Sequence, residues 1–127
     1  MSGMHELGIM FEVIKRVEAV AKQHQVDRVE KIVLQVGEIA TVIPHFLREC
    51  YPVAVDRTDF VDTELVIEMI PANGCCRQCD IVYHLMKDEG RCPNCHQMNF
   101  DELSGREFSI KEIVVAEGGK NGSSPNY

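Results

Sequence analysis

Apolar residues recur at steps of three and four along residues 5–24, with charged residues between them. This spacing places the apolar side chains on one face of an α-helix. Met4, His5 and Glu6 stand where this helix begins, and a carboxylate there is favoured by the helix dipole. The predicted core face consists of Leu7, Met10, Phe11, Ile14, Val17 and Ala21.

Three further segments are predicted to be strands, at residues 28–36, 64–71 and 107–116, because β-branched residues and partial alternation mark each of them. The residues expected to face the core are Ile32, Leu34 and Val36, then Leu65, Ile67 and Met69, then Phe108, Ile110 and Val114.

A second helix is predicted over residues 44–56, with Pro44 as its first residue and Pro52 kinking or ending it. The side chains that it offers to the core are Phe46, Leu47, Cys50, Tyr51 and Val55.

The order helix, strand, helix, strand, cysteine segment, strand predicts an α+β fold. Two helices are expected to pack on a small three-stranded sheet that carries an inserted four-cysteine zinc-ribbon module. The expected boundaries are 1–71 plus 105–117 for the α+β domain and 72–104 for the zinc-binding domain. The strands that flank the insertion are expected to be neighbours in the sheet. Residues 118–127, rich in Gly, Ser and Asn, are expected to be a disordered tail.

Composition narrows the classes of function. With 127 residues, the chain has the length of one domain. A net charge of −7 disfavours binding to nucleic acid through phosphate contacts. We find no run of 18 apolar residues and no basic, apolar leader at the N-terminus. A cytoplasmic protein, with its cysteines reduced, is therefore expected.

Four cysteines form the strongest chemical signal: Cys76 and Cys79, then twelve residues, then Cys92 and Cys95. Two Cys-x2-Cys pairs at this separation favour a tetrahedral zinc site. A rubredoxin-like iron site, two redox dithiols or a pair of disulfides are the alternatives. Four thiolates close the coordination shell, which argues against catalytic zinc. So short a segment needs the metal to fold, and structural zinc contributes ~10–16 kcal/mol in small modules.

The remaining cysteines and histidines carry weaker signals. Cys50 and Cys75 are interpreted as partly buried thiols outside the metal site. His96, which follows Cys95, is interpreted as a solvated residue beside the site. The other histidines, His24, His45 and His84, are interpreted as surface residues.

Three features together resemble one family: Met4-His5-Glu6 opening an amphipathic helix, the cysteine quartet, and the closing segment 104–115. They resemble the HypA/HybF family of nickel metallochaperones, which serve maturation of [NiFe]-hydrogenase and, in some organisms, urease. The resemblance extends over about residues 4–117.

The resemblance implies a nickel-binding α+β domain with an inserted zinc domain. Nickel cargo is expected at Met4, His5 and Glu6, and structural zinc at the four cysteines. It implies delivery of nickel to a hydrogenase large-subunit precursor with a HypB-type nickel GTPase as partner, and possible work with urease accessory proteins. Neither nucleic acid nor a membrane is expected as a partner, and the chain is expected to be a monomer or homodimer.

The N-terminal chemistry agrees with this expectation and departs from the family in one respect. Imidazole and amide nitrogens suit square-planar nickel better than tetrahedral zinc. The family's motif starts at the initiator Met, whereas Met1-Ser2-Gly3 precede Met4 in this chain. The nitrogen of Met4 is then a peptide nitrogen. Either the true start is Met4, or the extension is a remnant of expression, or the site works without that amine.

Two other classes of function were weighed. A zinc-ribbon protein-interaction adaptor or nucleic-acid binder is the alternative, although the acidic balance disfavours nucleic acid. An enzyme is not expected, because we find no glycine-rich phosphate loop, nucleophile elbow or open histidine-rich metal site.

Overall fold

The computed structural model describes residues 4–116, and only the main chain of Met4. The predicted tail, 118–127, lies outside the described residues. Two helices and two three-stranded sheets confirm the predicted α+β class. The elements are α1 (Met4–Gln23), β1 (Val29–Gly37), α2 (Pro44–Val55), β2 (Glu64–Ile70), β3 (Asn73–Cys76), β4 (Val82–His84), β5 (Phe100–Glu102) and β6 (Phe108–Val115).

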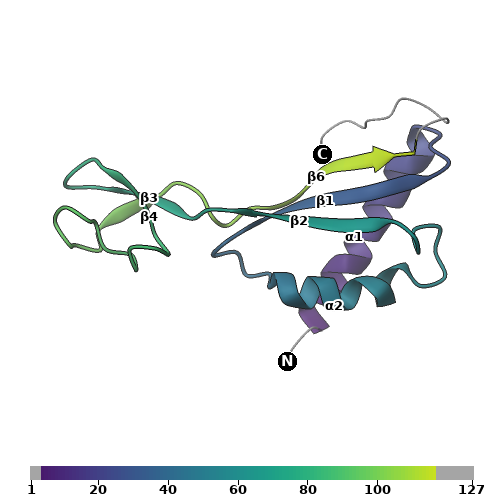
Figure 1. The fold of residues 1–127 in the computed structure, drawn as a ribbon, viewed down its shortest axis with the longest axis horizontal. Helices are drawn as coiled ribbons and strands as arrows, with labels where there is room; N and C mark the ends of the chain where they lie inside the picture. The colour runs from purple at the N-terminus through teal and green to yellow at the C-terminus, as the bar shows by residue number, and fades with distance from the viewer. Residues whose placement is uncertain (1–3, 117–127) are drawn as a thin grey trace. The chain divides into compact units, whose positions relative to one another are not determined.

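The first sheet has the strand order β2-β1-β6 (Figure 1). The expectation that the two strands flanking the cysteine segment are neighbours is therefore wrong, because β1 lies between them. The residues of β1 explain its central place. Ile32, Val33 and Leu34 follow one another and are all buried, as in a strand covered on both faces, whereas β2 and β6 carry more exposed positions.

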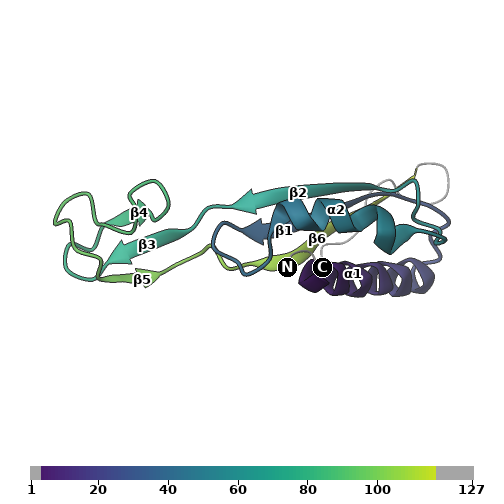
Figure 2. The ribbon, with the colours of Figure 1, turned by 90° about the horizontal axis from the view of Figure 1, so that it is seen from below.

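The helices α1 and α2 pack against each other and cover the sheet, as two views at right angles show (Figures 1 and 2). Met10, Ile14 and Val17 of α1 are buried as predicted. Phe11 is exposed instead, and Val13 is buried in its place. The apolar face of α1 is thus rotated by part of a turn from the predicted one.

The second helix begins at Pro44 and continues past Pro52 to Val55, close to the predicted range 44–56. A proline costs the helix one hydrogen bond, and the buried Ala54 and Val55 at its end offset this loss through packing. None of the helices in the described part of the chain combines the length and the apolarity needed to cross a bilayer.

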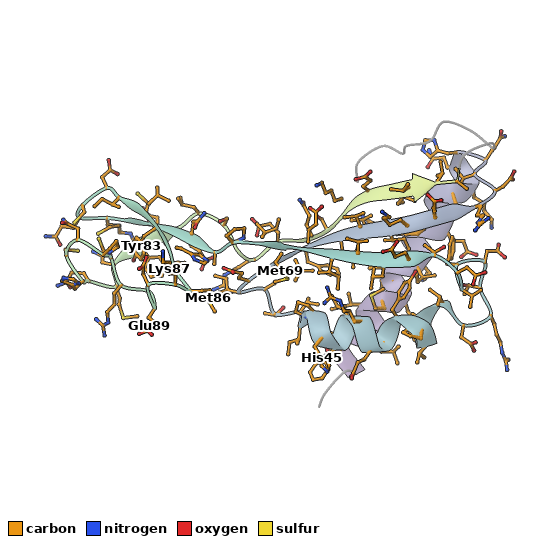
Figure 3. All side chains as sticks on the ribbon, viewed as in Figure 1. His45, Met69, Tyr83, Met86, Lys87 and Glu89 are labelled. Carbon is orange, nitrogen blue, oxygen red and sulfur yellow. The ribbon has the colours of Figure 1, made fainter. Side chains whose placement is uncertain are left out.

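Core-facing residues of the outer strands differ from expectation at two positions. Met69, expected in the core, is 47% exposed (Figure 3). Along β6 the alternation of buried residues shifts after Ile110, so Ile113 and Val115 are buried and Val114 is only partly so. A strict two-residue period cannot reveal such a shift.

The chain separates into two compact units. The first contains the described residues up to Gln35, Val42–Glu68 and the described residues from Ser109 onward. The second contains Val36–Thr41 and Met69–Phe108. The second unit therefore includes a short piece of chain that precedes α2, which the sequence assigned to the first domain.

The second unit is built on an antiparallel sheet of order β4-β3-β5. Gly74 in β3 pairs with Tyr83 of β4 on one side and with Glu102 of β5 on the other. A Cβ atom at Gly74 would stand 2.8 Å from Leu85 Cδ2 and 3.0 Å from Phe100 Cδ1. Glycine at this position therefore lets two large apolar side chains close over β3.

Candidate metal centres

The second unit brings together all four cysteines of the quartet, Cys76, Cys79, Cys92 and Cys95, with their Sγ atoms within 4.8 Å of one another. The Sγ atoms of Cys76 and Cys95 are 3.6 Å apart. A tetrahedral ion with bonds of about 2.3 Å to sulfur separates its ligands by about 3.8 Å. The donor set and its spacing therefore fit a metal such as zinc.

The two Cys-x2-Cys turns have the same main-chain geometry. The N–H groups of Asp80 and His96 donate to the carbonyls of Cys76 and Cys92 respectively, each at 2.8 Å. Asp80 and His96 both adopt a left-handed conformation, with φ of 59° and 65°. The α-turn closed in this way, from residue i to residue i+4, directs both sulfurs of each pair to one point.

Hydrogen bonds donated to the sulfur atoms stabilise negative charge on this cluster. The N–H of Cys79 donates to Cys76 Sγ at 3.3 Å, and Asn94 Nδ2 donates to Cys79 Sγ at 3.2 Å. The hydrogen bond from Cys79 is the main cause that lowers the pKa of Cys76 to about 7. The Gln97 N–H acts in the same direction on Cys95, but burial and the neighbouring thiols raise the pKa of Cys95 to about 12. Four thiolates this close together therefore need a cation.

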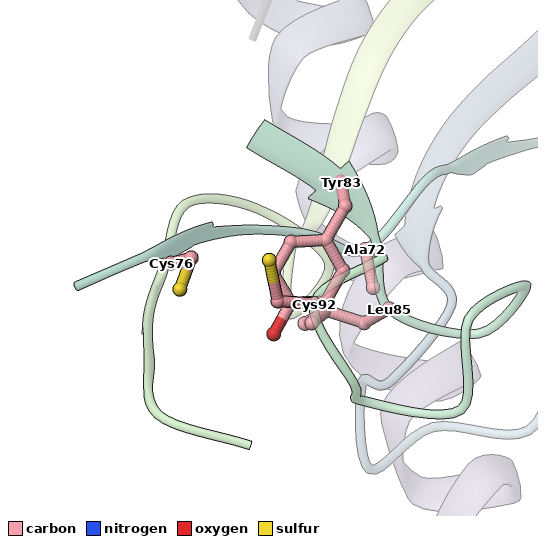
Figure 4. Packing of buried hydrophobic residues seen from close by; sticks show 5 residues of the cluster. All are labelled: Ala72, Cys76, Tyr83, Leu85 and Cys92. Atoms are coloured by element: carbon pink, nitrogen blue, oxygen red, sulfur yellow. The ribbon is translucent and has the colours of Figure 1, made fainter. Parts of the chain in front are cut away.

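Apolar packing closes the cluster on its inner side. Cys76 and Cys92 are buried together with Ala72, Tyr83 and Leu85 (Figure 4). The Tyr83 ring also meets Phe100 edge to face, with 6.1 Å between the ring centroids. Four sulfurs complete a tetrahedral shell, so this arrangement suits holding a metal rather than reacting at one.

Arg77, the second residue of the first turn, ties that turn to the chain around β5. Its Nε donates to Asp101 at 2.8 Å and its Nη1 to Asn99 at 3.1 Å. Its main-chain N–H donates to the Asn99 carbonyl at 3.0 Å. Three bonds from one residue fix the turn that carries Cys76 and Cys79.

Glu38 makes a second polar link in this unit, which was not predicted from the sequence. Its Oε1 accepts the N–H of Ala72 at 3.0 Å and lies 2.8 Å from His84 Nε2. The Ala72 hydrogen bond, followed by that of His84, lowers the pKa of the Glu38 carboxyl. His84 is thus half-buried and paired rather than a free surface residue. Nothing in the local sequence signals a pair separated by 46 positions.

At the beginning of α1, the residues expected to hold nickel lie in different environments. His5 is exposed. Glu6 is 4% exposed, and its Oε2 accepts the N–H of Ile43 at 3.0 Å. Ile43 is the N-cap of α2, and its side chain makes no capping hydrogen bond. Glu6 therefore caps a second helix from a distance. The Met4 side chain lies outside the described residues.

Within residues 4–116, only the cysteine quartet gathers three or more potential ligands at one point. Cys75 is half-buried, and its Sγ lies 3.7 Å from Asp80 Oδ1. His96 is exposed beside the quartet. His45, in the first turn of α2, is exposed and lies 3.2 Å from Glu49, measured from Nε2 to Oε2. The four-residue spacing of His45 and Glu49 is visible in the sequence and would have predicted that they lie side by side on a helix.

A protein-family model matches residues 4–115; its description is hydrogenase/urease nickel incorporation, metallochaperone, hypA. Among curated relatives, the hydrogenase maturation factor HypA of Chlorobium limicola is 32% identical over 91% of this chain and 99% of its own length. The protein of the same name from Nostoc punctiforme is 35% identical over 90% of this chain and 97% of its own length.

Two solved structures share the fold. The solution structure of the Ni metallochaperone HypA from Helicobacter pylori aligns with a TM-score of 0.59 and 20% identity, over 87% of this chain and 96% of that one. A second structure, described as the solution structure of HypA protein, aligns with a TM-score of 0.64 and 23% identity, over 89% of this chain and 97% of that one. At these identities the likeness shows the fold alone.

Proposed function

Because this chain belongs to the HypA family of hydrogenase and urease nickel-incorporation metallochaperones, we propose that it binds Ni(II) at Met4, His5 and Glu6. It then delivers the ion for maturation of [NiFe]-hydrogenase, with urease as a possible second target. In this role the protein is a carrier and not an enzyme, and its compartment is the cytoplasm.

The observation that carries this proposal is the contrast between His5 and Glu6. The His5 side chain is exposed in the first turn of α1, where its imidazole is open to a metal ion and to an incoming ligand. Glu6, one residue later, is buried and bonded to the N–H of Ile43. An accessible nitrogen ligand on a fixed helical turn suits an ion that is bound and later released.

Zinc is the proposed resident metal of the quartet. Support comes from the fit of four sulfurs to a tetrahedral ion and from the closed, partly buried cluster. When bound, the metal supplies structural stability to a small unit. The chain's own contribution is to bury two sulfurs and to direct N–H groups at the thiolates.

The proposed partners are a HypB-type nickel GTPase, the hydrogenase large-subunit precursor and, for urease, its accessory proteins. The surface of the second unit offers apolar side chains to a protein partner: Val82, Met86, Met98 and Leu103 are each more than half exposed. Exposed apolar residues of this kind are used in protein contacts.

Nickel titration of the zinc-loaded chain tests the proposal. We expect nickel to bind with micromolar or tighter affinity without displacing zinc, and His5→Ala to abolish that binding. His24→Ala is the matched control. It replaces an exposed histidine just past the opposite end of α1, about 30 Å away for a helix of this length. Titrating the chain with and without Met1-Ser2-Gly3 then shows whether a terminal amine at Met4 contributes. Nickel affinity that is unchanged in His5→Ala would contradict the proposed site.

A further inference from the structure

The first turn of α1 lies against the beginning of α2, and we name this region the N-terminal corner: His5 and Glu6 with residues 43–50. Two observations define it. The Ile43 N–H is 3.0 Å from Glu6 Oε2. Burial raises the pKa of the Cys50 thiol, and the negative charges of Glu6 and Glu49 raise it further. Glu6 therefore lies close to the second turn of α2 as well as to its N-cap.

His45 belongs to the N-terminal corner and is arranged as metal-binding histidines commonly are. Its side chain is 71% exposed, and its Nε2 lies 3.2 Å from Glu49 Oε2, one helical turn further on. Histidines that bind metals usually pair the second ring nitrogen with a carboxylate, which fixes the tautomer and the ring orientation. With Nε2 directed at Glu49, Nδ1 of His45 is the nitrogen left for a metal.

His45 lies in the part of α2 that adjoins the beginning of α1, where His5 is found. His45 is two residues from Ile43, whose N–H contacts Glu6, the neighbour of His5. The two views of the fold agree that α1 begins beside the beginning of α2 (Figures 1 and 2), and the His45 side chain stands at that end of α2 (Figure 3). Since both imidazoles are exposed, their side chains are free to rotate toward a shared ion without unpacking the core.

The ligands at the N-terminus give a reason for a second imidazole. With Met1-Ser2-Gly3 present, the Met4 nitrogen is a peptide nitrogen and not a terminal amine. The Met4-His5-Glu6 motif contains one imidazole, that of His5. Nickel favours nitrogen ligands. The N-terminal end of α1 carries partial positive charge, which the carboxylate of Glu6 in its first turn offsets. A second imidazole, that of His45, would add a neutral nitrogen donor to this motif.

We propose that His45 supplies a second imidazole to the nickel ion bound at His5, and that Glu49 orients the His45 ring. This proposal rests on the proposed function. His45 is then a nickel ligand outside the Met4-His5-Glu6 motif, and Glu49 is a positioning residue. The nickel site extends from α1 onto α2, so nickel binding joins the two helix ends.

Nickel titration and X-ray absorption of the full, zinc-loaded chain test this proposal with His45→Ala and His45→Gln. The Gln variant keeps a polar group opposite Glu49. Both variants are expected to weaken nickel binding by more than about tenfold, and Glu49→Gln by about tenfold, the lower end of the usual loss for such a partner. The absorption spectrum is expected to lose one imidazole per nickel in both His45 variants. His24→Ala is expected to behave as the wild type.

The outcomes separate the two proposals. Wild-type affinity and imidazole count in both His45 variants, with binding abolished in His5→Ala, would overturn the role of His45 and leave the proposed function standing. Unchanged affinity in His5→Ala would overturn the proposed nickel site, and the role of His45 would fall with it. Zinc content and helical circular dichroism confirm that each variant is folded.

Discussion

The cysteine quartet and the N-terminal corner differ in how they present the proposed metal ligands. In the quartet, Cys76 and Cys92 are almost fully buried, and four sulfurs close round one point. In the corner, His5 and His45 are exposed, and the buried Glu6 carboxylate accepts a main-chain N–H. A closed sulfur shell retains its ion, whereas exposed imidazoles allow a partner to exchange ligands. The difference is that expected between a structural metal and a cargo metal.

The two units that carry these sites are also stabilised differently. The first unit buries apolar residues from both helices and from the three-stranded sheet. The core cluster of the second unit has five buried residues, and two of them are Cys76 and Cys92. Without its metal the second unit has little apolar packing, so its stability is expected to depend on the ion.

The largest expected effect is loss of zinc in Cys92→Ala. We expect zinc content to fall from one equivalent to none and the second unit to unfold, because structural zinc contributes ~10–16 kcal/mol in small modules. The matched control is Cys75→Ala, next to the first pair but outside the quartet, which is expected to keep its zinc. Metal analysis measures the zinc content, and circular dichroism measures the folding. The helical signal of the first unit is expected to be preserved. One full zinc equivalent in Cys92→Ala would show that the ligands are assigned wrongly.

A moderate effect is expected at the N-terminal corner when Glu6 is replaced. Glu6→Ala leaves the Ile43 N–H without its acceptor and is expected to cost about 1.5–3 kcal/mol of unfolding free energy, as for other hydrogen bonds to charged groups. Glu6→Gln keeps an acceptor oxygen of the same size, and we expect it to retain most of that stability. Thermal and denaturant unfolding of the two variants measure the difference, and equal losses in both would argue against the cap.

The same pair of variants separates the two roles of Glu6. Nickel affinity that falls in Glu6→Gln while stability is kept would assign the carboxylate to the metal. Unchanged affinity would leave Glu6 as the residue that fixes the first turn of α1, and His5 would then carry the motif's side-chain contribution alone.

Features encoded over short distances were predictable from the sequence. The Cys-x2-Cys pairs, the two helices and Pro44 at the beginning of α2 are all local patterns, and the structure contains each of them. The exposure of Phe11 and the burial of Val13 were not predictable with the same rule. A helical period indicates an apolar face, but the packing partner selects which part of that face is covered.

Features that depend on distant contacts were not predictable. The strand order β2-β1-β6 depends on which strand is buried on both faces. That burial comes from distant contacts, so the central position of β1 was not predicted. Glu6 bonds Ile43 across 37 positions, and Glu38 bonds Ala72 across 34. Each carboxylate accepts a hydrogen bond from a main-chain N–H in a remote segment. A single sequence does not show which remote segment will lie beside the carboxylate. In each unit the unpredicted contact is thus a polar link between remote segments.

The smallest expected effect concerns that link in the second unit, at Glu38. The Ala72 N–H and then His84 lower the pKa of the Glu38 carboxyl in the folded chain. A lowered folded pKa contributes stability that is present above the unfolded value of about 4.3 and is lost as pH falls through the folded value. We expect a nuclear magnetic resonance titration to give Glu38 a pKa below its usual range. His84→Ala is expected to move that pKa only part of the way back, because the Ala72 hydrogen bond, its largest cause, remains.

Glu38→Gln then tests whether the second unit depends on more than its metal. Both chains are measured at the same zinc concentration at every pH, so that the quantity compared is the difference in unfolding midpoint between wild type and variant. That difference is expected to be present at neutral pH and to shrink below about pH 4.3, where the unfolded wild-type chain takes up a proton on this carboxyl before the folded chain does. A Glu38 pKa at or above its usual range, or a difference that does not change with pH, would mean that this polar link adds no charge-dependent stability. The cysteine quartet, with the apolar cluster around it, would then be what holds the second unit together.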